Sequence, residues 1–393
     1  MRLCVVSFKE CWQDASGTWM SSGGFPTEIT ALSTLFEKLT LVIVPGSPQA
    51  GGIAFPRHAQ VVPLRKPVGA NSRRKLSVVA NAIHYLGSIA RGIRDADVVY
   101  TPLPGDIPLL GVLVATALRK RLCAIYMGSW VTNSQTTWMN RVTRWLMRRL
   151  AGGNHVMVSV GPGRNGVGPA ARMHRVFLTT VSDDELRRVQ PAVTRAPHSP
   201  RRVAYLGRLS PEKGLLYLLE AVSMLRADPT LAGFVPQVTL IGDGPQRAEL
   251  VARVRSLGCE DSVHFAGQMD RAGLIRELLR SDVSVLPSLT EGFPKARLDA
   301  MLCGVPVITT DVGFGRETIG LDGERGWVVP PGNASALSAA LRRIVTEPVD
   351  WPSLRLRCRR YVEDQTLEAW ARRIAEICAR QWNMGVVRGK LQV

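Results

Sequence analysis

The chain has 393 residues, of which 46% are hydrophobic and 21% charged, a size and composition typical of a soluble protein with two ordinary domains. Its seven cysteines are scattered and lack Cys-x-x-Cys spacing, which argues against a disulfide framework and a cysteine-ligated metal site. The formal net charge is +18, and residues 65–175 hold 17 Lys and Arg but only 3 Asp and Glu. We therefore expect an acidic partner to meet the first half of the chain.

Short β-rich runs alternate with helical patterns, which predicts βαβ units and two parallel sheets in succession. The expected strands are Leu3–Ser7, Leu41–Val44, Gln60–Leu64, Val98–Thr101, Leu122–Met127, Val156–Val160, Val203–Leu206, Val238–Ile241, Ser262–Phe265, Val283–Leu286, Val305–Thr309 and Trp327–Val329. The first run is too short for a signal peptide, and the longest apolar stretch, Leu109–Leu118, is shorter than the roughly 18 residues of a membrane span. These features favour a cytoplasmic protein.

The segment Gln190–Arg202 contains three prolines among polar residues, which is the composition of a linker. The excess of positive charge also falls at this point of the chain. We predict a Rossmann-like N-terminal domain over residues 1–196 and a second domain over residues 197–370, followed by a C-terminal helical segment over residues 371–393.

Ligands of open parallel sheets bind at the carboxyl ends of the strands, so binding side chains are expected in the strand-to-helix loops. Arg208 follows the strand Val203–Leu206, and Lys213 lies five residues further on, just before an expected helix. A guanidinium, an ammonium and a helix N-terminus together would favour a phosphate group. Two solvated surface cations remain the alternative.

A second pair of candidates is acidic. Glu291 follows the strand Val283–Leu286 beside Gly292, and Asp299 lies eight residues later, about two helical turns away and near the same face. Two carboxylates in one cleft suit sugar hydroxyls, which both donate and accept hydrogen bonds. A solvated helix residue is the alternative meaning of Asp299.

Three further loops have more than one interpretation. Gly23 and Gly24 precede a helical pattern from about Glu28 to Leu39, and they would either let the backbone approach a phosphate or form a plain turn. The loop from Gly242 to Pro245 favours a structural turn before a helix. Asp106 is either a cleft residue or a helix cap.

Taken in order, these loops resemble the nucleotide-sugar half of a GT-B glycosyltransferase, and the chain is most similar to glycosyltransferase family 4, the glycosyl transferases group 1. The resemblance is dense over about 200–345 and loose in the N-terminal half, and five ordered motifs at the family's spacing make it specific. The matching segments are Gly207-Arg208, Lys213-Gly214, Ile241 to Pro245, Phe265 to Gly267, Leu286 to Ser288, Glu291 to Pro294, Asp299 to Met301, Gly304 to Ile308 and Gly326 to Gly332.

The resemblance implies an α/β GT-B fold with two facing Rossmann-like domains, parallel sheets, an interdomain cleft and a C-terminal helix that crosses back to the first domain. It implies a hexosyltransferase-type enzyme that moves a sugar from a nucleotide diphosphate sugar to an acceptor hydroxyl with retention of configuration, in polysaccharide or glycolipid synthesis. The implied partners are the nucleotide-sugar donor and a carbohydrate or lipid-linked acceptor.

By matching position, Arg208 and Lys213 would hold the donor diphosphate, Glu291 the donor sugar and Asp299 the ribose. The implied donor-binding residues are Gly23, Gly24, Arg208, Lys213, Gln268, Met269, Glu291, Gly292, Phe293, Pro294 and Asp299. The implied catalytic group is Glu291, Arg208 and Lys213, to which we add Asp106 as a candidate for orienting the acceptor hydroxyl. Arginine, lysine and a helix N-terminus can stabilise a leaving diphosphate, so we expect no metal and no cofactor besides the donor.

Two departures from the family's pattern affect the expected chemistry. Met127 stands where many members carry a histidine, and Asp299 is one methylene shorter than the usual glutamate. A catalytically impaired, glycosyltransferase-like binding protein is therefore an alternative. The sequence pI of about 10.3 also prompts a nucleic-acid-binding protein, but no recognisable module supports one, so we expect no nucleic-acid partner.

The segment Thr136 to Leu150 has the pattern of an amphipathic helix. Its apolar arc contains Trp138, Met139, Val142, Trp145, Leu146 and Leu150, and the arginines beside the arc are Arg141, Arg144 and Arg148. This pattern predicts peripheral contact with an anionic membrane, at the inner face of the cytoplasmic membrane. An ordinary domain helix with its apolar arc in the core is the alternative.

Overall fold

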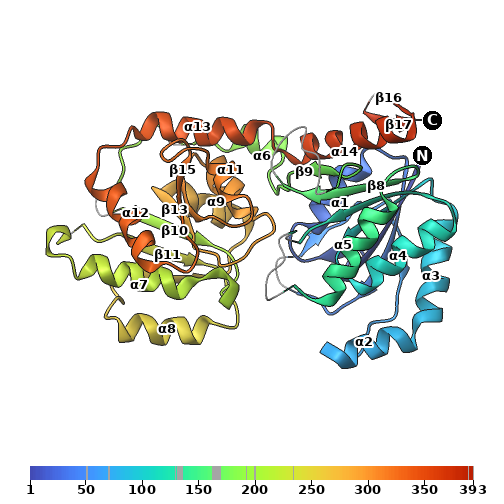
Figure 1. Ribbon diagram of the computed structural model, residues 1–393, viewed down its shortest axis with the longest axis horizontal. Helices are drawn as coiled ribbons and strands as arrows, with labels where there is room; N and C mark the ends of the chain where they lie inside the picture. The colour runs from blue at the N-terminus through green and yellow to red at the C-terminus, as the bar shows by residue number, and fades with distance from the viewer. Residues whose placement is uncertain are drawn as a thin grey trace. The chain divides into compact units, whose positions relative to one another are not determined.

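The computed structural model describes residues 1–49, 52–69, 71–128, 130, 136–161, 170–191, 193–198, 201–232, 234–387 and 389–392. The chain divides into two compact units, unit 1 (Met1–Thr180 and Leu367–Val393) and unit 2 (Val181–Thr366). Each unit is built of helices around its own mainly parallel sheet, which confirms the predicted α/β fold class (Figure 1).

Unit 1 contains the first and last elements of the chain. Its strands are β1 (Arg2–Gln13), β2 (Trp19–Ser21), β3 (Lys38–Pro45), β4 (Ile53–Ala54), β5 (Gln60–Pro63), β6 (Val98–Leu103), β7 (Arg121–Tyr126), β8 (His155–Val160), β9 (His174–Val176), β16 (Gly385–Val387) and β17 (Lys390–Gln392). Its helices are α1 (Phe25–Ser33), α2 (Asn71–Ala80), α3 (Ala82–Arg94), α4 (Asp106–Ala117), α5 (Trp138–Leu150) and α14 (Leu367–Trp382).

The main sheet of unit 1 pairs its strands in the parallel order β5-β3-β1-β6-β7-β8-β9, and β2 and β4 add antiparallel pairs beside the end of β1. The strands are continuous apolar runs because helices bury both faces of the sheet. One buried cluster joins Val6 and Ala124 of the sheet to Tyr85 of α3, Val112 of α4 and Met147 of α5. Helices α3, α4 and α5 therefore cover the same face of this sheet.

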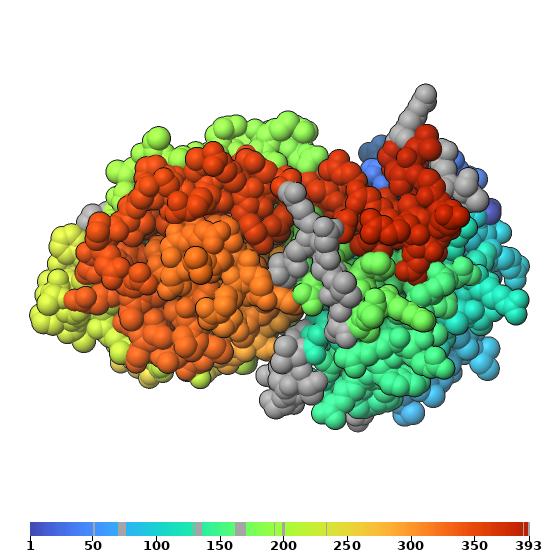
Figure 2. Space-filling view, turned by 45° about the horizontal axis from the view of Figure 1, so that its top comes forward, coloured from blue at the N-terminus to red at the C-terminus, as the bar shows by residue number. Residues whose placement is uncertain are grey.

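Helix α14 closes unit 1. It packs against α1 and contacts β8 and β9, although these elements lie far away in the sequence. Gln381 in its last turn donates a hydrogen bond to the carbonyl of His155 at 2.7 Å, and the indole of Trp382 donates to the carbonyl of Asn154 at 3.2 Å. Figure 2 shows the red C-terminal segment lying against green residues of unit 1.

Unit 2 alternates strands and helices almost without interruption. Its strands are β10 (Arg202–Leu206), β11 (Gln237–Ile241), β12 (Val263–Gly267), β13 (Val283–Leu286), β14 (Val307–Thr310) and β15 (Gly326–Val329). Its helices are α6 (Asp183–Arg188), η1 (Pro211–Lys213), α7 (Leu215–Arg226), η2 (Pro229–Leu231), α8 (Arg247–Ser256), α9 (Arg271–Arg280), α10 (Ala296–Leu302), α11 (Gly315–Ile319), α12 (Ala334–Thr346) and α13 (Trp351–Glu363).

The two sheets share a feature that positions binding sites. In unit 2 the parallel order is β12-β11-β10-β13-β14-β15, so the chain leaves β10 in one direction and returns on its other side at β13. In unit 1 the same reversal places β1 between β3 and β6. Ligands bind at such switch points because the loops on either side separate there and leave a crevice at the carboxyl ends of the strands.

The predicted linker is fastened to unit 2. The backbone N–H of His198 donates to Asp282 Oδ2 at 3.1 Å, and Arg195 donates to the carbonyl of Ser281 at 2.8 Å. Asp282 is fully buried, so this segment is held by an ionic anchor that its composition does not reveal. The units divide after Thr180 and before Leu367, whereas the sequence predicts boundaries after 196 and 370. Positions 192, 199 and 200 of the linker lie outside the described residues.

Helix α1 is shorter than the predicted pattern from Glu28 to Leu39. It ends at Ser33, and Leu39 belongs to β3. The hydroxyls of Thr30 and Ser33 donate to backbone carbonyls one turn earlier, at 2.8 and 2.7 Å, and such bonds compete with the helical ones. The segment that the sequence predicts to be one helix therefore contains the end of a helix, a turn and the start of a strand.

Candidate functional site

Three loops of unit 2 enclose a pocket of about 570 Å³ at the carboxyl ends of β10, β11 and β12. Its lining residues are Gly207, Arg208, Gly242, Asp243, Gly244 and Gln268. Arg208 is exposed and comes directly after the first of these strands. The pocket therefore brings together two predicted donor-binding residues, Arg208 and Gln268, with a loop that the sequence suggests is only a turn.

Close backbone contact explains the glycines in this pocket. Gly242 has a φ of +132°, and a Cβ there would lie 2.0 Å from the carbonyl oxygen of Gly207. The N–H of Leu209 donates to the carbonyl of Asp243 at 3.0 Å, which joins the two loops directly. A side chain at Gly242 would force these loops apart and open the pocket.

Lys213 and Glu291 form an ion pair in unit 2. The ammonium of Lys213 donates to Glu291 Oε1, and the hydroxyl of Ser288 donates to the same oxygen at 3.1 Å. Both charged side chains are largely shielded from solvent, with 22% and 13% of their surfaces exposed. The structure thus places the predicted phosphate-binding cation and the predicted sugar-binding carboxylate in direct contact.

Backbone packing holds the two loops of this ion pair together. The N–H of Leu289 donates to the carbonyl of Glu212 at 2.8 Å. Gly214 has a φ of +64° at the start of α7, and a Cβ there would lie 2.2 Å from the carbonyl oxygen of Pro287. The N-terminus of α7 is therefore pinned beside the loop that carries Glu291, which adds a source of positive potential to the site.

Tyr205 supports Arg208 from the end of β10. Its hydroxyl donates to the carbonyl of Arg208 at 2.8 Å. Burial raises the pKa of Tyr205, and the nearby carboxylates of Glu291 and Glu212 raise it further. The phenol therefore stays neutral and keeps its proton for this hydrogen bond at physiological pH.

The segment after Glu291 rests on a buried arginine that the sequence analysis does not single out. Arg297 donates to the carbonyls of Gly313 and Val312, both at 2.7 Å, and is 1% exposed. Burial lowers its pKa to about 10, although the charge of Glu291 acts in the opposite direction. Gly313 packs on Glu291, because a Cβ there would lie 2.6 Å from Glu291 Cβ. In the sequence, Arg297 is only one of two charges, with Asp299, on a mainly apolar helix, α10.

The other predicted donor-binding residues differ in their exposure to solvent. Phe293 and Pro294 are buried, and Gly292 is half-buried beside Glu291. Gln268 and Met269 are exposed after β12, in the position that the resemblance assigns to the rim of the base site.

Asp299 is held inside unit 2 by a cation. Arg271 donates to Asp299 Oδ1 at 2.6 Å and also grips Glu185 of α6 with two nitrogens, at 2.5 and 3.2 Å. Burial acts to lower the pKa of Arg271, but the two carboxylates outweigh it and raise that pKa. Only 7% of the Asp299 side chain is exposed, so it is not the solvated helix residue of the alternative interpretation.

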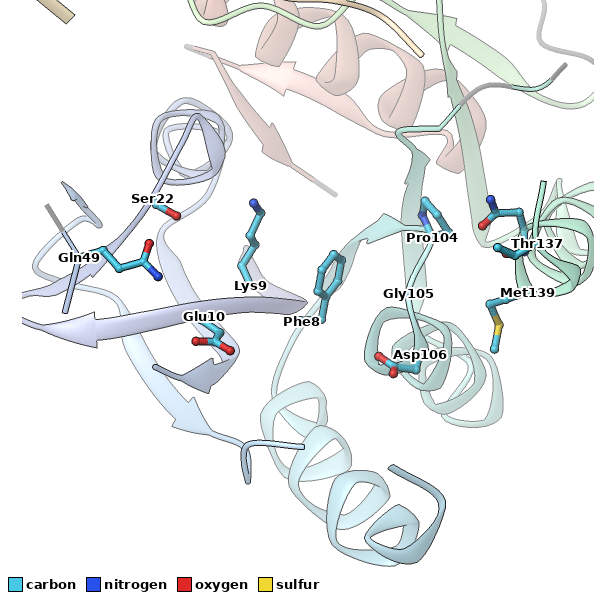
Figure 3. A pocket seen from close by; sticks show the side chains of 11 residues that line it. Phe8, Lys9, Glu10, Ser22, Gln49, Pro104, Gly105, Asp106, Thr137 and Met139 are labelled. Carbon is cyan, nitrogen blue, oxygen red and sulfur yellow. The ribbon is translucent and has the colours of Figure 1, made fainter. Parts of the chain in front are cut away.

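Unit 1 has a pocket of about 540 Å³ at its own switch point, between the carboxyl ends of β1 and β6 (Figure 3). Its lining residues are Phe8, Lys9, Glu10, Ser22, Gln49, Pro104, Gly105, Asp106, Thr137, Met139 and Asn140. Phe8 approaches the second strand end so closely that a Cβ at Gly105 would lie 2.9 Å from its ring. An aromatic ring, carboxylates and amides in one crevice are groups that bind sugars through stacking and hydrogen bonds.

An irregularity in β1 forms one wall of this pocket. The pairing of β1 with β3 shifts register between Val6 and Glu10, so the residues between them leave the regular alternation of the strand. Glu10 carries an ion pair to Lys66 at 2.9 Å. The sequence analysis misses Phe8, Lys9 and Glu10, whose signal is two charges directly after the apolar part of the first strand.

Asp106 lines the unit 1 pocket and is not the cap of α4. The N-cap of that helix is Gly105; Asp106 is its first residue, and its Oδ1 accepts a hydrogen bond from the N–H of Ile107 at 2.9 Å. Met127 follows the neighbouring strand β7, is half-buried, and donates its N–H to the carbonyl of Leu103 at 2.7 Å. Gly23 and Gly24 lie at the start of α1, next to the pocket residue Ser22.

Helix α5 divides the predicted apolar arc between core and solvent. Trp138 and Trp145 are 63% and 62% exposed, whereas Leu146 and Leu150 pack against the core. Arg144, predicted at the edge of the arc, is buried and donates to the carbonyl of Trp130 at 2.6 Å. The apolar arc is therefore shared between solvent and core, because the helix turns part of it toward the sheet.

The described part of the chain has neither a cluster of metal-ligating side chains nor a membrane-spanning helix. No group of three His, Cys, Asp or Glu side chains in the described part of the chain is placed to hold a metal ion. No described helix is both long and apolar enough to pass through a bilayer.

Two solved structures are similar to the whole chain. Sucrose-phosphate synthase from Thermosynechococcus elongatus has a TM-score of 0.72 and 20% identity, covering 98% of this chain and 99% of that one. Anabaena Alr3699/HepE in complex with UDP-glucose has a TM-score of 0.67 and 17% identity, covering 97% of this chain and 100% of that one. The chain has the GT-B fold.

Residues 187–365 match the family described as "Glycosyl transferases group 1", and this match lies within unit 2. Glycogen synthase of Mycobacterium tuberculosis is 27% identical over 259 residues, which are 62% of this chain and 56% of that protein. The chain thus spans about half the length of the curated relatives it matches. Together with the fold, these matches support a GT-B glycosyltransferase.

Proposed function

We propose that the chain is a family 4 glycosyltransferase that moves a hexose from a nucleotide diphosphate sugar to an acceptor hydroxyl with retention of configuration. The observation that carries the proposal is the pocket of unit 2 with Arg208 in its wall, together with Lys213 on the same loop, which pairs with Glu291 of the loop after β13. Both lie inside the segment that matches the glycosyl transferases group 1. The likeness of the chain to HepE, solved with UDP-glucose, agrees with a nucleotide-sugar donor.

In this proposal the donor diphosphate binds Arg208, Lys213 and the N-terminus of α7. The amides of Gly23 and Gly24 at the start of α1 are further candidates for a donor phosphate. Charge-assisted hydrogen bonds from a planar guanidinium and an ammonium suit phosphate oxygens. Each such bond contributes about 1.5–3 kcal/mol, so the loss of one weakens donor binding by roughly 10- to 150-fold.

The Lys213–Glu291 ion pair would open when the donor binds. Lys213 exchanges the carboxylate for a phosphate oxygen, and Glu291 then accepts hydrogen bonds from the donor sugar. The contact to Ser288 keeps Glu291 in place during this exchange. A partly buried ion pair holds both groups ready at the site, and its replacement by phosphate avoids leaving a buried charge without a partner.

The nucleoside would lie across the loops after β12 and before α10. Gln268 and Met269 would border the base, the amides around Gly292, Phe293 and Pro294 would face the sugar and phosphates, and Asp299 would contact the ribose. Arg271 holds one oxygen of Asp299 and would keep this carboxylate in place for the ribose.

The reaction needs no histidine at the Met127 position. The bond between the anomeric carbon and the leaving phosphate oxygen breaks, the acceptor oxygen bonds to the same face of that carbon, and the departing diphosphate takes the acceptor proton. Arg208, Lys213 and α7 stabilise the negative charge that develops on the leaving group, so we expect no metal and no further cofactor. Methionine does not take up a proton at neutral pH, but its thioether can pack against a sugar.

The acceptor would bind in the pocket of unit 1, where Asp106 orients the reacting hydroxyl. The pocket's carboxylates, amides and Phe8 suit a carbohydrate, and Thr137, Met139 and Asn140 bring it next to the exposed Trp138 of α5. We propose that Trp138 and Trp145, with the exposed Arg141 and Arg148, rest on an anionic membrane that presents a lipid-linked acceptor. Synthesis of a polysaccharide or glycolipid at the inner face of the cytoplasmic membrane fits this arrangement.

Calorimetric titration with a panel of nucleotide diphosphate sugars tests the donor site. We expect one nucleotide sugar to bind the wild type and the Asp106→Asn variant equally, and Arg208→Ala more than tenfold more weakly. Equal affinity in wild type and Arg208→Ala would contradict the assigned phosphate site. NMR of the product formed with that donor then reports the configuration at the anomeric carbon, and inversion would contradict the proposed mechanism.

A further inference from the structure

Unit 1 exposes a row of large apolar side chains on α2 and α3, the α2–α3 face. Leu76, Val79, Ile83 and Leu86 are 70%, 70%, 88% and 39% exposed. Leu76 and Val79 lie three residues apart on α2, and Ile83 and Leu86 lie three residues apart on α3, so each pair lies on one side of its own helix. Exposed apolar side chains gathered in this way mark a surface that contacts a membrane or a partner.

The fold does not need these side chains. The opposite side of the same helices supplies Val78, Tyr85, Ile89 and Ile93 to the buried cluster of unit 1. The two helices are therefore anchored by one row of apolar residues while a second row faces solvent. Covering the second row would gain roughly 25 cal/mol for each Å² of apolar surface removed from water.

The charge pattern around this face indicates what covers it. No charged residue occurs between Lys75 and Arg91, and the sequence places Arg73 and Arg74 directly before this stretch. Arg91 and Arg94 at its other end are exposed. An uncharged apolar row bounded by basic residues matches the boundary between the acyl chains and the anionic headgroups of a bilayer.

The α2–α3 face lies in the helix layer that contains α5. Helices α3, α4 and α5 cover the same face of the sheet and share one buried cluster (Figure 1). The outer sides of these helices add Leu113 of α4 and Trp138 and Trp145 of α5 to the exposed apolar residues. One side of unit 1 thus presents apolar and basic side chains over several helices, which is a broader surface than a single amphipathic helix.

We propose that the α2–α3 face inserts into the surface of an anionic lipid bilayer. The inference deepens the membrane contact in the proposed function, because it adds α2 and α3 to the contact of α5. A second copy of this chain is a poorer occupant, since the basic residues that flank the face would meet the same positive charges on the other copy. Anionic headgroups instead gain about 1 kcal/mol from each nearby basic residue.

A fluorophore at position 83 tests insertion directly. All seven native cysteines are buried, so Ile83→Cys can be labelled selectively with an environment-sensitive dye. With vesicles of phosphatidylglycerol and phosphatidylcholine we expect a blue shift and increased emission, and none with the dye on Leu321→Cys, an equally exposed apolar site of unit 2 at 82%. An unchanged spectrum at position 83 under conditions where the protein floats with the vesicles would overturn the proposal.

Flotation of the full chain separates this surface from the one on α5. Ile83→Asp should lower the fraction bound to anionic vesicles at least tenfold, and Leu321→Asp should leave it unchanged. If Trp138→Ala with Trp145→Ala abolishes flotation while Ile83→Asp does not, the contact of α5 stands and the α2–α3 proposal fails. If light scattering instead shows a dimer that Ile83→Asp dissociates, and vesicles do not bind, a second copy covers the face and the proposal is wrong.

These outcomes are independent of glycosyl transfer. Turnover of a water-soluble acceptor, measured without vesicles, should be the same in wild type and Ile83→Asp, because position 83 lies outside both pockets. If Ile83→Asp loses vesicle binding but keeps full turnover, the result supports the membrane surface and leaves the proposed function untouched. If the wild type has no turnover, the proposed function fails while the membrane proposal stands.

Discussion

The pockets of the two units lie at different places in their sheets and are built differently. The unit 2 pocket follows β10, β11 and β12, whereas the unit 1 pocket lies at the switch point between β1 and β6. The pocket of unit 2 is lined by three glycines and by Arg208, Asp243 and Gln268, and the Lys213–Glu291 pair joins the loops after β10 and β13 outside this lining. The pocket of unit 1 is lined by side chains from an irregular strand, two loops and the start of α5. A site of the first kind can recognise a group common to many donors, such as a diphosphate, whereas one of the second kind can vary with the acceptor.

The largest expected effect is on the backbone of the unit 2 pocket. Gly242→Ala places a Cβ 2.0 Å from the carbonyl oxygen of Gly207, at a φ that side chains rarely adopt. We expect a loss of more than about 3 kcal/mol in the free energy of unfolding of unit 2, from overlap and backbone strain together. Urea titration followed by circular dichroism measures it.

Gly258→Ala is the matched control for this change. Gly258 has a φ of +61° but open space around it, so only the backbone strain of about 1 kcal/mol applies. If both variants lost a similar free energy of unfolding, the close contact between Gly242 and Gly207 would not constrain the pocket of unit 2. That pocket would then be no more dependent on its main chain than the pocket of unit 1.

The next effect concerns the ion pair of unit 2. Lys213→Ala should weaken donor binding by about 1.5–3 kcal/mol, the contribution of one charge-assisted hydrogen bond. A double-mutant cycle with Glu291→Ala sharpens the assignment, since the two side chains contact each other without the donor and should lose that coupling when it is bound. Equal coupling energies with and without donor would contradict the proposed exchange of partners.

Asp106 tests the role of the unit 1 pocket. Asp106→Asn retains a side-chain acceptor for the N–H of Ile107, so this hydrogen bond survives while the charge of the carboxylate is lost. We expect a roughly 10- to 100-fold decrease in kcat/KM for the acceptor, which is about 1.4–2.7 kcal/mol, with no change in donor affinity. Initial rates at saturating donor measure the effect, and a parallel loss of donor affinity would argue against separate donor and acceptor pockets.

The smallest expected effect is a pH dependence of unit 1. Burial lowers the pKa of His155 below its usual 6.5, so the native state keeps it neutral where the unfolded chain takes up a proton. As the pH falls below about 6.5 the unfolded state binds more protons, and the free energy of unfolding should fall by up to about 1 kcal/mol. His155→Gln should remove this dependence between pH 7.5 and 5.5, and the exposed His58→Gln should not.

The sequence predicts the fold and the unit 2 site more completely than the unit 1 site. The strands are recognisable because parallel, doubly buried strands are continuous apolar runs. Arg208 is found because a cation in the loop after a strand favours a phosphate, whereas Gln268 comes only from the family resemblance. The sequence predicts that Gly242 lies in a turn before a helix, but it does not predict that Gly242 lines a pocket, since both a turn and a pocket wall require glycine.

The features that the sequence does not predict depend on contacts between distant segments. Phe8 and Glu10 line a pocket because β1 shifts its register, and no local spacing indicates that shift. Arg271 holds Asp299 across 28 positions of sequence. The anchoring of the predicted linker to the buried Asp282 likewise arises from tertiary contacts alone.

Turnover with the matching donor and acceptor, compared among wild type, Glu291→Ala and Met127→His, tests the central claim most directly. The account predicts that the wild type is active without a histidine at position 127 and that Glu291→Ala loses most of this activity while the protein stays folded. If the wild type were silent and only Met127→His turned over, the chain would be a degenerate transferase. Full activity of Glu291→Ala would contradict the assigned sugar site.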